Sequence, residues 1–140
     1  MRRSLSISLL ALLSACASAY QREGPSGGYS DTQLAPNVFR VSFRGNGYTS
    51  PDRADELALL RSADVTLANG FTHFTVVDGQ YRERQGAFMS GNQVYPITHP
   101  STTKTIMCFR GAPDSTSLVY DAAFLCNSLG TKYKVSCQSN

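Results

Sequence analysis

Short stretches in which apolar and polar residues alternate mark the strands of this chain. Between residues 38 and 44, Phe39, Val41 and Phe43 fall on one face, and the intervening arginines and serine fall on the other. This period of two predicts a half-buried strand. Residues 71–77 and 104–110 are rich in β-branched and aromatic residues and are bounded by turn-forming residues, which predicts two more strands.

Two other stretches carry apolar residues at helical spacing. Residues 51–68 follow a favoured N-cap serine, start with proline and end before an Asn-Gly pair, which predicts a helix. Arg61 and Asp64 fall within its apolar stripe, where we expect an ion pair at the helix–sheet border; a functional charge pair is the alternative. A second helix is expected to begin near residues 114–117 and to end at about residue 129, before Gly130.

The order strand, helix, strand predicts a right-handed parallel crossover. We therefore expect an α+β domain over residues 37–140, a two-layer sandwich in which a small mixed sheet (β-α-β-loop-β-α) carries both helices on one face. Glycines and prolines interrupt residues 80–103, which are predicted to form a long loop. A short hairpin between residues 87–89 and 93–97 is the alternative for part of that loop.

The first fifteen residues have the pattern of a bacterial lipoprotein signal peptide. Two arginines precede an apolar core at residues 5–13, and Leu13-Ser14-Ala15-Cys16 has the form of a lipobox. We expect cleavage before Cys16 and acylation of that cysteine, which would anchor the protein in a membrane through lipid. An ordinary secretory signal with a chance cysteine at the cut is the alternative. Ala17, in place of aspartate, favours sorting to the periplasm-facing leaflet of the outer membrane.

Residues 16–36 are small, polar and rich in glycine, which predicts the lipidated cysteine followed by a flexible tether that could stretch to about 70 Å. Loss of Arg2 and Arg3 with the leader lowers the formal net charge from +3 to +1. A nearly neutral chain lacks the clustered basic face that nucleic-acid binding requires. No apolar run reaches the roughly 20 residues of a spanning helix, so an integral membrane architecture is not expected.

The segment YSDTQLAPNVFRVSFRGNGYTS and the residues that follow it up to Phe71, together with the lipobox and Tyr120–Leu125, resemble an uncharacterised family of small proteobacterial envelope lipoproteins. The resemblance implies a bacterial, lipid-anchored domain that faces the periplasm. It implies no catalytic residues.

Lipidation of Cys16 would leave Cys108, Cys126 and Cys137 in an oxidising compartment, where one disulfide and one free thiol are expected. The tail after residue 130 can fold back toward the second helix, so we favour a Cys126–Cys137 bridge; the other two pairings stay open. If Phe109 faces the helices, Cys108 faces away from them. A cysteine enzyme with Cys108 and a histidine base is the alternative use of the thiol.

Other chemistry has weaker signals. His73 and His99 stand outside any metal-ligand spacing, so we expect no metal and no cofactor. The Gly-Asn-Gly turn at residues 45–47 precedes acidic residues where a phosphate would sit, which opposes anion binding.

The segment at 80–103 combines aromatic and cationic residues, as recognition surfaces do. We interpret it either as a partner surface or as a cover for a sheet edge. The residues of the candidate surface are Tyr81, Arg82, Arg84, Phe88, Tyr95 and His99.

These observations predict a lipid-anchored protein of the bacterial envelope that acts as a non-enzymatic interaction or structural module in the periplasm, with an envelope protein as its candidate partner. A ligand-binding or stress-sensing lipoprotein that signals to an inner-membrane partner across the tether is the alternative. The class of any small-molecule ligand is left open.

Overall fold

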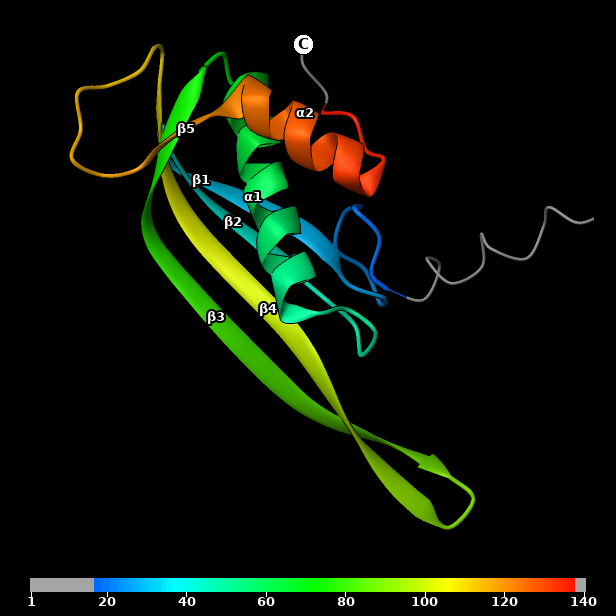
Figure 1. Cartoon of the computed structure of the whole chain (residues 1–140). Helices are drawn as coiled ribbons and strands as arrows, with labels where there is room; N and C mark the ends of the chain where they lie inside the picture. The colour runs from blue at the N-terminus through cyan, green and yellow to red at the C-terminus, as the bar shows by residue number, and fades with distance from the viewer. Residues whose placement is uncertain (1–16, 138–140) are drawn as a thin grey trace, which may run out of the picture.

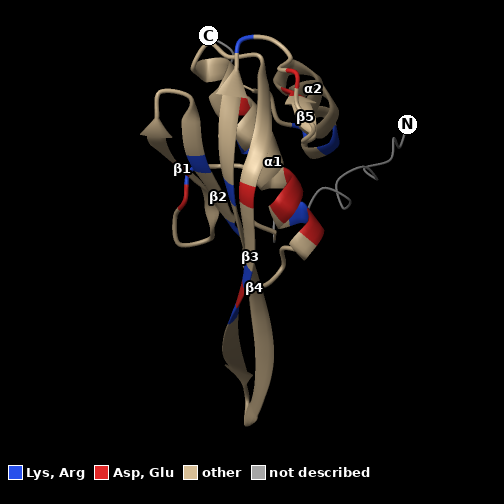
Figure 2. Cartoon of the chain, turned by 90° about the vertical axis from the view of Figure 1, so that its left-hand side faces the viewer, with Lys and Arg blue, Asp and Glu red and all other residues tan. Residues whose placement is uncertain are grey.

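The computed structural model describes residues 17–137, which form one antiparallel sheet and two helices. The strand order is β1-β2-β4-β3-β5, and both helices lie on the same side of the sheet (Figure 1 and Figure 2). The α+β class is confirmed. In chain order the elements are β1 (Gly28–Ala35), β2 (Val38–Arg44), α1 (Pro51–Ala68), β3 (His73–Ser90), β4 (Gln93–Phe109), β5 (Val119–Asp121) and α2 (Ala122–Tyr133).

The prediction of a mixed sheet is wrong. Every strand pair in the described residues is antiparallel. Strands β2 and β3 do run in the same direction on either side of α1, but β4 lies between them and pairs with both. The physical reason is that the chain after β3 turns back at once, so that β4 fills the space between the two parallel strands.

Because the chain turns back directly after β3, the predicted long loop at residues 80–103 is also wrong. The segment forms the outer parts of β3 and β4, paired in register from Arg82 with Ser101 to Ser90 with Gln93. Gly91 has φ 62°, a positive value that a two-residue hairpin turn requires and that glycine adopts without strain. The alternative of a short hairpin placed the turn correctly and underestimated its length.

Helix α1 begins and ends where the sequence predicts. The Ser50 hydroxyl accepts a hydrogen bond from the amide of Arg53 at 3.1 Å, and Gly70 has φ 81° beyond the last turn. Helix α2 differs from the prediction at both ends, because it begins at Ala122 after an Asp121 cap and continues through Gly130 to Tyr133. Residues 114–117 lie outside it.

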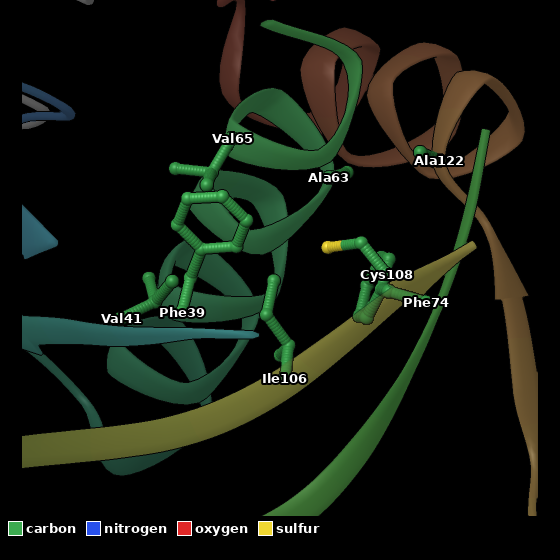
Figure 3. Packing of buried hydrophobic residues seen from close by; sticks show 8 residues of the cluster. All are labelled: Phe39, Val41, Ala63, Val65, Phe74, Ile106, Cys108 and Ala122. Atoms are coloured by element: carbon green, nitrogen blue, oxygen red, sulfur yellow. The ribbon is translucent and has the colours of Figure 1, made fainter. Parts of the chain in front are cut away.

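The hydrophobic core lies between α1 and the inner face of the sheet. One cluster joins side chains from β2, β3, β4, α1 and the start of α2 (Figure 3): Phe39, Val41, Ala63, Val65, Phe74, Ile106, Cys108 and Ala122. A second cluster packs the N-terminal half of α1 against β2 and is extended by partly buried residues of α2. Together they account for the packing of both helices on one side of the sheet.

Most of the predicted tether is part of the fold. Ser18 is 1 % exposed: its amide donates to Thr49 Oγ1 at 3.0 Å, and its hydroxyl accepts from the Asn46 amide at 2.8 Å. Residues 28–35 form edge strand β1, paired with β2. Small polar residues are typical of linkers, but here one hydroxyl fixes the connection between β2 and α1. Cys16 and the predicted signal peptide at 1–15 lie outside the described residues.

The helices within residues 17–137 are too short or too polar to cross a bilayer.

Candidate interaction site

The paired ends of β3 and β4 project from the domain as a two-stranded arm. Strand β2 pairs with β4 only as far as Ser101, whereas β3 and β4 continue together to the turn (Figure 1). We define the arm as residues 84–99. Its seven residue pairs from Arg84–His99 to Ser90–Gln93 give it a length of about 23 Å at roughly 3.3 Å per residue.

Five of the six residues predicted as a partner surface share one face of this hairpin. Residues directly opposite each other in an antiparallel pair have side chains on the same face, and positions two apart along a strand repeat that face. The pairs Arg84–His99 and Phe88–Tyr95 therefore lie on one face with Arg82. Tyr81 lies on the other face, so the structure does not bring it together with these five.

Phe88 and Tyr95 form the aromatic part of this face. Their rings stack across the two strands with centroids 5.1 Å apart, and the side chains remain 50 % and 42 % exposed. Met89 and Val94 form the corresponding pair on the opposite face and are 73 % and 63 % exposed. Val94 was not among the residues predicted for a partner surface, although the alternative of a short hairpin included it within residues 93–97.

Tyr81 has a local role. Its hydroxyl donates to Glu83 Oε1 at 2.7 Å, and this hydrogen bond to the carboxylate raises the pKa of Tyr81 to about 12. The phenol therefore stays protonated at neutral pH and does not act as an acid or base there.

Three arginines and a histidine lie together at the base of the arm. Arg44, Arg82, Arg84 and His99 line a hollow of about 280 Å³ together with Glu83. Figure 2 shows the charged residues of β3 and β4 confined to the part of the hairpin near the domain, while the outer part has none. The base can thus contact anionic groups, and the outer part offers only uncharged side chains.

The sheet face that the helices leave open is polar. Its central hollow, about 460 Å³, lies between two arginines and is lined otherwise by short hydroxyl residues, one amide and one carboxylate: Arg40, Ser42, Asp78, Gln80, Arg82, Ser101, Thr103 and Thr105.

A groove of about 560 Å³ lies between the arm and the connection from β2 to α1. Its lining includes the apolar side chains of Tyr48, Phe88 and Ile97, and Tyr48 is 76 % exposed. An added Cβ at Gly47 would clash with Ile97, so the connection and the arm are in close contact beside the groove.

Two of the cysteines form the predicted disulfide. Cys126 and Cys137 are bonded with Cα atoms 5.8 Å apart, which confirms the favoured pairing. Cys108 carries the free thiol; contrary to the orientation considered from the sequence, it faces the helices and lies 3.4 Å from Thr66 Oγ1. Burial raises the pKa of the Cys108 thiol, which opposes thiolate formation.

The histidines do not meet this thiol. His73 pairs with Phe109 and His99 with Arg84, so both lie at positions whose side chains face away from that of Cys108. His99 is also nine residues from Cys108 along β4, about 30 Å at strand rise. The described residues contain no cluster of His, Cys, Asp and Glu that could hold a metal ion.

The predicted Arg61–Asp64 ion pair is confirmed and belongs to a structural network. The guanidinium of Arg61 contacts Asp64 Oδ2 at 3.0 Å and Asp31 Oδ1 at 2.6 Å, and the Tyr20 hydroxyl donates to Asp64 at 2.9 Å. Burial and the neighbouring carboxylate raise the pKa of Tyr20. The network fixes the N-terminal segment and β1 against α1.

No protein-family model, curated protein or solved structure matches this chain.

Proposed function

We propose that this protein is a lipid-anchored module of the bacterial envelope that works by contact and not by catalysis, with the arm as its contact element. Acylated Cys16 would hold it in the outer membrane, facing the periplasm. The observation that carries the proposal is the arm itself, a long paired extension with exposed aromatic side chains near its end.

The arm is not required to complete the core. Both buried clusters are built from residues outside 84–99, and the side chains from residue 81 to residue 96 are exposed. Exposed large apolar side chains gathered on one element are typical of interaction sites. We regard the domain as a two-layer sandwich that supports this element. The second possibility raised by the sequence, protection of a sheet edge, fits less well because these strands extend from the middle of the sheet.

The leader and the N-terminal segment support a short anchor. Ser18 is fixed to the β2–α1 connection, and one residue, Ala17, separates it from Cys16. The domain would therefore sit next to the bilayer that holds it. An envelope protein partner, if captured, would contact the protein close to that surface.

A crosslinking experiment in cells tests the proposal. We expect a photoreactive residue at position 88, on the arm, to give a defined adduct with an envelope component, whereas the same residue at position 118, which is 68 % exposed on the β4–β5 connection, gives none. Equal labelling at both positions would contradict the contact function. Adducts that disappear only when a reaction product is added would also contradict it, because they would indicate a catalytic site.

Ligand binding is the second candidate, and the groove beside the arm favours it. A pocket of about 560 Å³ with Tyr48 and Phe88 in its lining is within the size range of small-molecule sites. We expect Tyr48→Ala to weaken the binding of an apolar fluorescent probe if the groove holds a ligand, with Leu118→Ala as the control. The alternative in which the protein signals to an inner-membrane partner across the periplasm would need a longer tether than the residues before Ser18 provide.

A further inference from the structure

The outer arm has a composition that differs from the rest of the surface. No Asp, Glu, Lys, Arg or His occurs from Gln85 to Thr98, and Figure 2 shows this part of the hairpin without charge. Met89 and Val94 are the most exposed of its large apolar side chains, at 73 % and 63 %. The segment therefore exposes large apolar side chains to water, next to uncharged polar residues such as Ser90 and Gln93.

The apolar side chains lie on both faces of the hairpin near its turn. Met89 and Val94 are directly opposite each other on one face, and Phe88 and Tyr95 are opposite each other on the other. A protein groove covers one face of a docked hairpin and leaves the other in water. A lipid environment surrounds both faces, so this arrangement favours a bilayer over a protein as the occupant.

The arm and the N-terminal segment leave the domain at the same end. Ser18 binds Thr49 in the connection between β2 and α1, and Gly47 of that connection packs against Ile97 of the arm. Figure 1 shows the N-terminal segment and this connection at the end of the sheet from which the arm extends, with the β4–β5 connection at the other end. Two peptide units separate Ser18 from Cys16, so a lipid on Cys16 would be attached no farther than about 7 Å from Ser18.

The arm is long enough to reach that bilayer. From the Gly86–Ile97 pair to the turn it extends about 15 Å at strand rise. The depth of entry is limited, because from the Glu83–Pro100 pair out to the turn the two strands pair only with each other, and their outer backbone groups need water or headgroups. Tyrosine favours this interfacial zone, and Arg82 and Arg84 at the base are placed to bind lipid phosphates.

We propose that the tip of the arm, residues 87–95, enters the interfacial zone of the bilayer that holds the lipid anchor and forms a second membrane contact. The inference rests on the proposed anchor at Cys16 for the closeness of the bilayer. With two contacts the domain would be held in one orientation on the membrane, and the open polar face of the sheet would be presented at a fixed angle.

Because the chain contains no tryptophan, a single tryptophan reports on each position. The full-length protein, processed in cells and purified, is reconstituted in phosphatidylethanolamine–phosphatidylglycerol vesicles that contain lipids brominated near the headgroup. We expect Met89→Trp to show a blue-shifted emission and strong quenching. The matched control Leu118→Trp, exposed at the other end of the domain, stays unquenched. Val94→Asp added to Met89→Trp is expected to reduce the quenched fraction about tenfold.

The mass of the N-terminal peptide from the same samples separates the two proposals. If Cys16 is acylated and Met89→Trp is no more quenched than Leu118→Trp, the membrane contact of the arm is refuted and the anchor stands. If Cys16 is unmodified, the anchor is refuted, and quenching at position 89 then tests the arm alone. A third outcome would overturn the inference. If Met89→Trp is not quenched in vesicles and its emission shifts to the blue only after an envelope protein is added, the arm binds a protein partner.

Discussion

Cys108 shows how one residue's surroundings decide its chemistry. Its thiol is 1 % exposed and contacts Thr66 in the core, and burial raises its pKa. We predict that a maleimide probe does not label Cys108 in the native protein and labels it fully in urea. Labelling of the native protein at neutral pH would reopen the cysteine-enzyme hypothesis.

Glu56 connects the two helices in a way that depends on pH. Its carboxylate accepts from Lys132 at 2.7 Å and from Tyr133, and these hydrogen bonds lower its pKa below the ordinary 4.5. A folded pKa below the unfolded one means that the contact stabilises the fold above about pH 4.5 and that this contribution is lost as the pH falls through the lowered value.

We therefore predict that Glu56→Gln lowers the free energy of unfolding by less than about 1 kcal/mol at pH 7, because the pair is largely solvated. The difference from the natural protein should be smaller at pH 3, below the ordinary pKa of 4.5, than at pH 7. Urea unfolding at both pH values measures it, with Asp114→Asn in an exposed loop as the control. A difference that grows toward low pH would contradict this account.

At the scale of elements, the disulfide holds the C-terminal tail on the second core cluster. Cys126 in α2 is bonded to Cys137, eleven residues later, and Leu129, Tyr133 and Val135 pack against the same cluster. Closing a loop of this length contributes up to about 3 kcal/mol in loop-entropy models. We predict that replacing both cysteines by serine lowers the stability by up to that amount. Urea unfolding under non-reducing conditions measures the loss, and an unchanged midpoint would show that the tail contributes nothing.

The elements that the sequence predicts are those with a one-sided pattern. Strand β2 alternates because one face is buried, and α1 carries caps at both ends. The arm has no buried face beyond Glu83, so no alternation between core and solvent is imposed on it, and its prolines and glycines resemble those of a loop. The sequence predicted strands here only as an alternative, in the short hairpin between residues 87–89 and 93–97.

Long-range contacts set the remaining differences. Ser18 is fixed by Thr49, thirty-one residues away, and nothing near it in the sequence shows that bond. Cys108 faces the helices because the strand register places it opposite the core residue Phe74, and the order of elements along the chain does not reveal that register. The disulfide was predictable because both cysteines lie in one local fold-back.

At the scale of the whole molecule, the domain and the arm should be separable. We predict that replacing residues 85–98 by an Asn-Gly turn changes the free energy of unfolding by no more than about 0.5 kcal/mol, because these residues contribute nothing to the core. Phe74→Ala, in the core, should cost about 3–5 kcal/mol in the same urea titration. A large loss on removing the arm would mean that it is structural.

The proposed place of this protein in the envelope depends on the proposed lipid anchor at Cys16. The most direct measurement is the mass of the N-terminal peptide of the mature protein isolated from bacterial membranes. We predict that this peptide begins at Cys16 and carries thioether-linked diacylglycerol and an N-acyl chain. A mature N-terminus at any other residue, or an unmodified Cys16, would contradict the proposed place of this protein in the envelope.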